Sequence, residues 1–131
     1  MSLVFDTSVL INLERKEPKT VEAVRRLAEV DPLAPSVAFL AYFEFIHGLH
    51  AKSPKNKEQS LSFIEQFRCL EPTRRTAHIL SRLLIAHALK GEGITMSDAL
   101  IASQAIEHNM ILVTGDKQFQ KIKELKVALA Y

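Results

Sequence analysis

The sequence predicts an α/β fold, a three-layer α/β/α sandwich in which helices cover both faces of a central parallel sheet. Short apolar runs of strand length recur along the chain, separated by longer segments with apolar residues at three- and four-residue spacing. Strands that alternate with helices in this way pair in parallel through right-handed crossovers. The 131 residues match the length of one ordinary domain, and we expect a single domain over residues 1–131.

The first predicted strand is the apolar run at residues 3–5. A loop at residues 6–8 follows it, and then a helix whose apolar side chains begin at Val9. Pro18 stands in the first turn of a second amphipathic helix, where its missing N–H has no intrahelical partner to lose. That helix is expected to stop before Pro32.

The second predicted strand, at residues 33–37, contains a proline and is therefore irregular or near an edge of the sheet. Ser36 is expected to cap the helix that follows, which runs to about Gly48. A serine–proline pair begins another helix, expected over residues 53–67. The third strand is expected at residues 69–70.

Thr73 begins a long amphipathic helix, which Gly91 or Gly93 closes. A further helix is expected over residues 97–108. Two apolar runs predict the last strands, the second more weakly: residues 110–113 and 127–129. Strands and helices thus alternate to the end of the sequence.

The composition is that of an ordinary globular protein with a slight basic excess. The formal net charge is +2 and the isoelectric point is about 8.8, which permits a polyanionic partner without requiring one. The single cysteine, Cys69, is expected in the core and fits a reducing compartment. The longest apolar run, at residues 37–43, is far shorter than the roughly 20 residues that cross a bilayer. The N-terminus lacks a secretion signal, so we expect a cytoplasmic protein with no membrane segment.

Two acidic residues lie at or just beyond the ends of predicted strands. Asp6 ends the run LVFD, and Asp116 ends the run ILVTGD. In open parallel sheets, ligands bind beyond the carboxyl ends of the strands, where loops from neighbouring strands converge at the point of order reversal. We therefore expect both carboxylates at that edge of the sheet.

Two further acids stand within predicted helices beside apolar residues. Asp98 lies at a helix start, where the dipole favours an anion by about 0.3–1 kcal/mol, so a solvent-exposed cap explains this residue equally well. Glu44 lies within FLAYFEFIHGL, where little polar face remains for it. Four carboxylates in apolar settings repel one another if they converge, unless a cation neutralises them. Oxygen ligands favour Mg²⁺ or Mn²⁺, and the convergence itself is a hypothesis at this point.

Four motifs, in this order and at this spacing, resemble those of the PIN-domain family, and especially of the small VapC-type toxins of prokaryotic toxin–antitoxin pairs. They span essentially the whole chain: FDTSVLI, FEFIHG, SDALIASQA and LVTGDKQF. The resemblance implies the PIN-like form of the three-layer fold with an acidic pocket. It also implies which residues are the catalytic, metal-binding carboxylates: Asp6, Glu44, Asp98 and Asp116.

Other residues near the motifs match the family as well. Thr114 corresponds to the hydroxyl residue that commonly supports the last acid, and Ser8 lies close enough to Asp6 to orient it. Phe119 fits the aromatic residue after the last motif. Phe45 departs from the pattern, because leucine is more usual there, but this departure removes no acid.

The resemblance implies a nuclease that acts mostly on RNA, and the chemistry fits the four acids. A divalent ion held by carboxylates activates water and stabilises charge on the phosphodiester oxygens. We therefore expect an endoribonuclease that depends on Mg²⁺ or Mn²⁺ and leaves a 5′-phosphate and a 3′-hydroxyl. The resemblance further implies the toxin of a type II toxin–antitoxin system, with an antitoxin partner and a homodimeric state expected by analogy.

The alternative is a PIN-like RNA-binding or scaffold module without catalysis, against which the four acids argue. His47 and His50 could indicate Zn²⁺, but a zinc site needs three or four ligands of suitable type. A phosphatase with an aspartyl nucleophile would need a second Asp where this chain has Ser8. RNA attraction needs cations near the motifs, although an ordinary solvated surface position is the favoured interpretation of each candidate: Arg15, Lys16, Arg74, Arg75 and Lys117.

Overall fold

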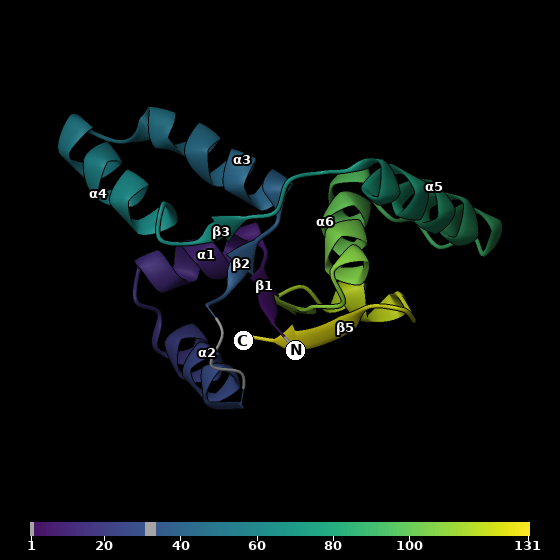
Figure 1. Cartoon of the computed structure of the whole chain (residues 1–131). Coiled ribbons are helices and arrows are strands. Elements are labelled where there is room, and N and C mark those ends of the chain that lie inside the picture. Colours follow the sequence, from purple (N-terminus) through teal and green to yellow (C-terminus); the bar gives the residue numbers. More distant parts are fainter. Residues whose placement is uncertain (1, 31–33) are drawn as a thin grey trace.

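The computed structural model describes residues 2–30 and 34–131, and a five-stranded parallel sheet forms its centre (Figure 1). The strands are β1 (Leu3–Phe5), β2 (Ser36–Val37), β3 (Arg68–Cys69), β4 (Ile111–Thr114) and β5 (Lys126–Leu129). The helices are α1 (Thr7–Glu14), α2 (Pro18–Val30), α3 (Phe39–Gly48), α4 (Pro54–Ile64), α5 (Arg74–Leu89) and α6 (Met96–Glu107). Two short 3₁₀ helices are η1 (Leu49–Ala51) and η2 (Lys117–Lys121).

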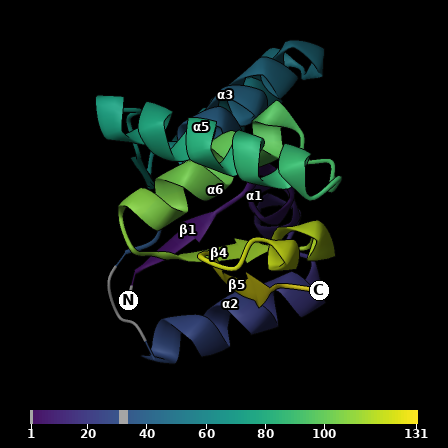
Figure 2. The same ribbon diagram turned by 90° about the vertical axis from the view of Figure 1, so that its right-hand side faces the viewer.

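Helices cover both faces of the sheet. Figure 2 shows α5 and α6 on one side of β1, β4 and β5, and α2 on the other side. The helices α3 and α4 lie next to each other at the left of Figure 1, whereas α5 and α6 lie at its right. The predicted three-layer α/β/α sandwich is therefore confirmed.

The order of the strands reverses between β1 and β4. The sheet has the order β3-β2-β1-β4-β5, so the chain first builds outward from β1 to β3 and then returns to place β4 on the other side of β1. Phe5 pairs with Val113, and the N–H of Asp6 donates to the Val113 carbonyl at 3.3 Å. The carboxyl ends of β1 and β4 therefore meet at the switch point, where open α/β sheets bind their ligands.

The central strands are buried on both faces, which explains their uninterrupted apolar runs. Leu3, Val4 and Phe5 in β1 are all buried, and so are Leu112 and Val113 in β4. A strand covered on both sides carries apolar side chains at every position rather than at alternate ones. Each buried side chain of this kind contributes about 1.5–3 kcal/mol, so the core fixes the register that brings the two strand ends together.

The second strand is interior, whereas the sequence predicted a strand that is irregular or near an edge. Ser36 and Val37 pair with β1 on one side and β3 on the other. Residue 33 of the predicted strand lies outside the described residues, and Pro35 precedes the observed strand, where it breaks no ladder. The edge is β3 instead, and for this reason Cys69 is half-buried rather than in the core. Burial, and the negative charge of the acidic residue just after β3, raise the pKa of the Cys69 thiol.

Some predicted boundaries differ from the observed ones by a few residues. The helix expected to reach Phe67 ends at Ile64, because its last residues form turns that lead into β3. The strand expected at 69–70 starts one residue earlier, and the strand expected at 110–113 starts one residue later. The helix α2 is described as far as Val30, and the predicted stop before Pro32 falls on residues 31–33, outside the described part of the chain. None of these shifts changes the order of the elements.

The helix α3 begins without a capping side chain of its own. The prediction that Ser36 caps this helix is wrong, because Ser36 lies buried within β2. Ala38 is at the cap position and forms no side-chain hydrogen bond. The carboxamide of Gln104 in α6 takes over this role. Its Oε1 accepts the Phe39 N–H at 2.8 Å, and its Nε2 donates to the Leu70 carbonyl at 2.8 Å. Gln104 is fully buried, so one amide satisfies two backbone groups and joins α6 to α3.

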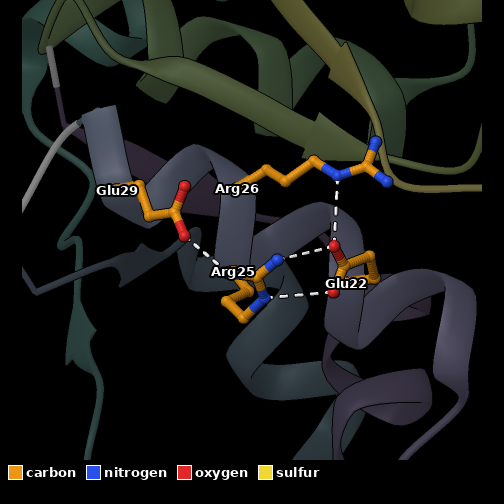
Figure 3. Close-up of polar contacts among 4 residues, drawn as sticks. All are labelled: Glu22, Arg25, Arg26 and Glu29. Atoms are coloured by element: carbon orange, nitrogen blue, oxygen red, sulfur yellow. Dashed lines mark hydrogen bonds and ion pairs between the residues drawn. The ribbon is translucent and has the colours of Figure 1, made fainter.

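Ion pairs cover the solvent face of α2 (Figure 3). Arg25 contacts Glu22 at 2.7 Å and Glu29 at 2.5 Å, and Arg26 contacts Glu22 at 3.2 Å. The hydrogen bond from Arg25, helped by Arg26, lowers the pKa of Glu22 to about 2. These exposed pairs add little stability, but they engage both arginines within α2.

Among residues 2–30 and 34–131, we find no helix that combines the length and the apolar character needed to traverse a bilayer.

The Gln104→Met variant should show what the buried amide contributes. Met keeps the shape of the side chain but leaves the Phe39 N–H and the Leu70 carbonyl without their partner, so the free energy of unfolding should fall by about 2–4 kcal/mol. Urea denaturation measures the difference. Gln59→Met, at an exposed position on α4, is the matched control and should change stability by less than about 0.5 kcal/mol. Equal effects of the two substitutions would contradict the capping role.

Candidate active site

The buried carboxylate of Asp6 lies at the junction of β1 and α1. Asp6 follows Phe5 directly and is the N-cap of α1, so the loop expected at residues 6–8 is replaced by the start of the helix. Its Oδ1 accepts hydrogen bonds from the Ser8 hydroxyl at 2.8 Å and from the Val9 N–H at 3.2 Å. The residue is 6% exposed, and burial raises its pKa above the usual 3.8, although its hydrogen bonds oppose the rise. The charged form is therefore costly at this position.

The hydroxyl of Thr114 connects two of the four acids. Thr114 ends β4 and is fully buried. Its Oγ1 donates a short hydrogen bond to Oδ2 of Asp6 and accepts the N–H of Asp116 at 3.1 Å. One side chain thus holds both the carboxylate after β1 and the backbone after β4.

Gly115 leaves room for an aromatic ring beside Asp116. A Cβ atom at position 115 would lie 2.0 Å from Cζ of Tyr131, so another residue there would displace that ring. Asp116 itself is exposed and caps η2, because its Oδ1 accepts the Gln118 N–H at 2.9 Å. The glycine of the TGD sequence therefore has a packing reason.

Asp98 stands in the first turn of α6, and Thr95 is the residue that caps this helix. The Thr95 Oγ1 accepts the Asp98 N–H at 3.1 Å. Asp98 is half-buried, so it is not the fully exposed cap that the sequence also allowed. Burial raises its pKa, and the hydrogen bond with Thr95 opposes this rise. Three negative charges raise the pKa further: those of Asp116, Asp6 and Glu44.

Glu44 is exposed, which contradicts the expectation that it lacks a polar face. The helix α3 buries Phe45, but Phe43 is half exposed, so the surface around Glu44 is open. The expectation was wrong because aromatic residues on both sides of a helix need not all be covered by the rest of the fold. The Thr7 hydroxyl donates to Oε1 of Glu44 at 2.7 Å. This bond ties α3 to the residue that follows Asp6.

The structure brings the four predicted acids to one edge of the sheet, and we call them the carboxylate cluster: Asp6, Glu44, Asp98 and Asp116. Two of them follow the neighbouring strands β1 and β4, which lie side by side in Figure 2. Glu44 is tied to the start of α1 by its hydrogen bond with Thr7. The charges of Asp6, Glu44 and Asp116 all raise the pKa of Asp98. The cluster is therefore a region of concentrated negative charge.

The donors of the carboxylate cluster suit a hard divalent cation that keeps part of its water shell. Within the described part of the chain, no three His, Cys, Asp or Glu side chains form a ready metal-binding arrangement. Mg²⁺ commonly binds through one or two carboxylates and retains several waters, so it does not require such an arrangement. Oδ2 of Asp6 accepts one hydrogen bond, from Thr114, which leaves it a lone pair for a further contact. The oxygen donors therefore fit Mg²⁺ or Mn²⁺.

Three of the candidate cations lie at the end of α1 or just after β4. Arg15 lines a groove between α1 and α3 together with Glu44. Lys16 follows it in the turn after α1, with a φ of +59°. Lys117 is exposed and directly follows Asp116. Arg15 and Lys117 are therefore the cations placed next to members of the cluster.

Two of the candidate cations, Arg74 and Arg75, lie at the end of α6 that is remote from Asp98. They begin α5, and the Thr73 hydroxyl before them donates to Glu107 at 2.6 Å. Glu107 ends α6, whereas Asp98 is in its first turn, a separation of about 14 Å along the axis at 1.5 Å per residue. The expectation that these arginines lie near the cluster is wrong, because α5 and α6 run in opposite directions.

The histidines considered for zinc pack against aromatic rings instead. The ring of His47 stacks on Phe43 with centroids 5.5 Å apart and meets the ring of His50 at 5.4 Å. No further His, Cys, Asp or Glu among the described residues joins them in a metal-binding arrangement. These contacts favour packing over metal binding.

Sequence reasoning missed two residues near the cluster: Thr7, which hydrogen bonds to Glu44, and Tyr131, which packs at Gly115. Thr7 lies inside the first motif, so a hydroxyl next to Asp6 was a usable signal. Tyr131 gave no signal, because its neighbour Gly115 is sixteen positions away in the chain and the contact exists only in the fold.

Comparisons with known proteins agree with the observed fold. The family model for the PIN domain matches residues 3–125. No curated protein matches the sequence. A chain of VapBC2 from Rickettsia felis, bound to a fragment of promoter DNA, is 25% identical with a TM-score of 0.81, and 98% of each chain is covered. A chain of VapBC-1 from nontypeable Haemophilus influenzae is 27% identical with a TM-score of 0.81, covering 99% of this chain and 98% of that chain.

The similarity to a third solved structure concerns the fold alone. A chain of a toxin–antitoxin complex from Klebsiella pneumoniae is 20% identical with a TM-score of 0.77, and 99% of this chain and 98% of that chain are covered.

The Thr114→Val variant tests the hydroxyl between the two strand ends. Near pH 7 the free energy of unfolding should fall by about 1–3 kcal/mol, because the Asp6 carboxylate and the Asp116 N–H lose a partner. The pKa of Asp6 is raised in the folded state, so Asp6 takes up a proton as the pH falls through that pKa towards the unfolded value near 3.8. The loss should therefore be smaller near pH 3.8, where a carboxyl with a raised pKa is mostly protonated, as measured by urea unfolding in EDTA.

Thr114→Ser is the matched control, since it keeps the hydroxyl and should lose less stability than Thr114→Val at pH 7. A loss in Thr114→Val that is the same at both pH values would contradict the idea that this hydroxyl stabilises the charge of Asp6.

Proposed function

The chain belongs to the PIN-domain family, and on this premise we propose that it is a metal-dependent endoribonuclease, the toxin of a type II toxin–antitoxin system. The carboxylate cluster carries the proposal, because the charges of Asp6, Glu44 and Asp116, which come from separate parts of the chain, all act on Asp98. A divalent cation relieves this repulsion. The similarity to VapBC chains supports the toxin role. A cytoplasmic location is part of this proposal.

The residues that would hold Mg²⁺ or Mn²⁺, directly or through water, are the four of the carboxylate cluster. When bound, such an ion lowers the pKa of water and stabilises the charge that develops on the phosphodiester oxygens. Asp6 is the fixed member, because Ser8, Val9 and Thr114 all hydrogen bond to its carboxylate. Burial and these bonds hold it in one orientation.

The exposed members of the cluster face the substrate side. Glu44 and Asp116 are open to solvent, whereas Asp6 is covered by Thr114 from the sheet. An RNA strand would therefore approach across Glu44 and Asp116, with Arg15 and Lys117 beside them to attract its phosphates. Hydrolysis in this arrangement would leave a 5′-phosphate and a 3′-hydroxyl.

The purified chain should cut labelled single-stranded RNA in the presence of Mn²⁺ or Mg²⁺, and EDTA should stop the reaction. Asp6→Asn and Asp98→Asn should each lower the rate at least about 100-fold, because a neutral amide is a poor ligand for a hard cation. Gel analysis of the products gives the rate and the identity of the ends.

Glu58→Gln, an exposed acid on α4, is the matched control and should cut at the normal rate. Thermal unfolding checks that all variants are folded. Near-normal cleavage by either aspartate variant would refute the assignment of that residue, and binding of RNA without any cleavage would favour a non-catalytic PIN-like module.

We also propose an antitoxin partner and a homodimer, in both cases by analogy with toxin–antitoxin complexes. Exposed apolar side chains on two helices support the presence of partner surfaces: Phe39 and Phe43 on α3, and Ile85 and Leu89 on α5. The two residues of each pair are four positions apart and so share one face of their helix, and exposed apolar surface commonly marks an interface.

Expression of the chain alone should arrest bacterial growth, and co-expression of the small protein encoded next to it should relieve the arrest. Asp98→Asn at the same expression level should not arrest growth, since the proposed toxicity depends on cleavage. Growth counts after induction measure the effect. Equal growth of cells with the wild-type chain and with Asp98→Asn would contradict the toxin role.

A further inference from the structure

A second hollow adjoins the carboxylate cluster, and we call it the side pocket. It has a volume of about 140 Å³ and lies between the end of α5, the start of α6 and η2. Its main lining residues are His87, Ile94, Asp98, Gln118, Phe119 and Lys121. Asp98 belongs both to this pocket and to the carboxylate cluster, so any occupant would lie directly beside the proposed metal site.

The side pocket has the size and lining of a site for one flat ring. Ligands of drug size need about 300–1,000 Å³, so a pocket of this volume admits a smaller group. Phe119 is buried and Ile94 half-buried, which gives the pocket an apolar floor, and Gln118 and Lys121 are exposed at its rim. An apolar floor with a few polar groups around it is the usual form of a ligand site.

A buried imidazole lines the pocket from α5. His87 is 5% exposed and lies in the last turn of that helix. The chain reverses at Gly91, whose φ is +69°, and the Glu92 N–H donates to the His87 carbonyl at 3.0 Å. This turn brings Oε2 of Glu92 to 3.5 Å from Nδ1 of His87. The ring is therefore held in place, and its Nε2 has no hydrogen bond within the described residues.

We propose that the side pocket receives one nucleobase of the RNA strand, that of a nucleotide adjoining the phosphodiester that is cut. The proposal rests on the proposed function, because it takes RNA as the substrate and the carboxylate cluster as the place of cleavage. Gln118 offers both a donor and an acceptor to the edge of the base, and His87 offers a ring nitrogen. Lys121 attracts the adjoining phosphate.

These groups predict two different kinds of effect. Contacts with the edge of a base discriminate between bases, whereas contacts with a phosphate position the strand and carry no sequence information. Gln118 and His87 should therefore set a base preference at one position next to the cut. Lys121 should change the rate for all sequences alike.

The test uses the full chain with Mn²⁺ and a pool of single-stranded RNAs of random sequence, and the product ends are sequenced. Gln118→Ala and His87→Phe should reduce the base preference at one position beside the cut by about 3- to 10-fold. Lys121→Ala should slow cleavage of all sequences and weaken its salt dependence. Gln120→Ala and Lys123→Ala, at exposed positions in or just after the same 3₁₀ helix, are the matched controls and should behave as wild type.

A second measurement separates this proposal from the proposed function. The anisotropy of a short fluorescent RNA in EDTA reports binding without cleavage. Weaker binding by Gln118→Ala and Lys121→Ala than by the two controls supports the side pocket, whether or not the wild-type chain cuts RNA. If the wild-type chain cuts RNA and both Gln118→Ala and His87→Phe keep the wild-type base preference at every position, the proposed role of the side pocket is contradicted. The proposed nuclease activity is then still supported. A wild-type chain that neither cuts nor binds RNA overturns both.

Discussion

The site depends on the burial of one carboxylate, that of Asp6, at the point where the strand order reverses. Asp6 ends β1 and caps α1, and the hydroxyl of Thr114 reaches it from the end of β4. Because β1 and β4 are neighbours only through the return of the chain after β3, this contact exists only when β4 pairs with β1.

Gathering further acids around Asp6 works against the stability of the folded chain. Burial raises the pKa of Asp6, and the charges of the other three acids add to the effect of burial at Asp98. Buried or crowded carboxylates of this kind cost free energy unless something else uses them, which is why perturbed pKa values are common at functional sites. A divalent cation would convert this cost into binding energy, and this is the physical argument for the proposed metal site.

Much of the fold could be predicted from the sequence because its signals are local. The apolar runs and the helical spacing gave the order of the elements, and the rule for open parallel sheets placed Asp6 and Asp116 at one edge. The remaining features depend on partners distant in the chain. Gln104 caps a helix 65 residues away, and the half-exposed Phe43 that leaves Glu44 open depends on what the fold covers. The roles of the four acids remain proposals, which their convergence supports.

The most direct test is a crystal structure of the chain grown with Mn²⁺, with anomalous scattering used to locate the ion. We expect a manganese peak at the edge of the sheet between β1 and β4, in contact with Asp6 or Asp98 directly or through one water. Crystals at a Mn²⁺ concentration that supports cleavage, with no peak at this edge or with the ion held by other residues, would contradict the account.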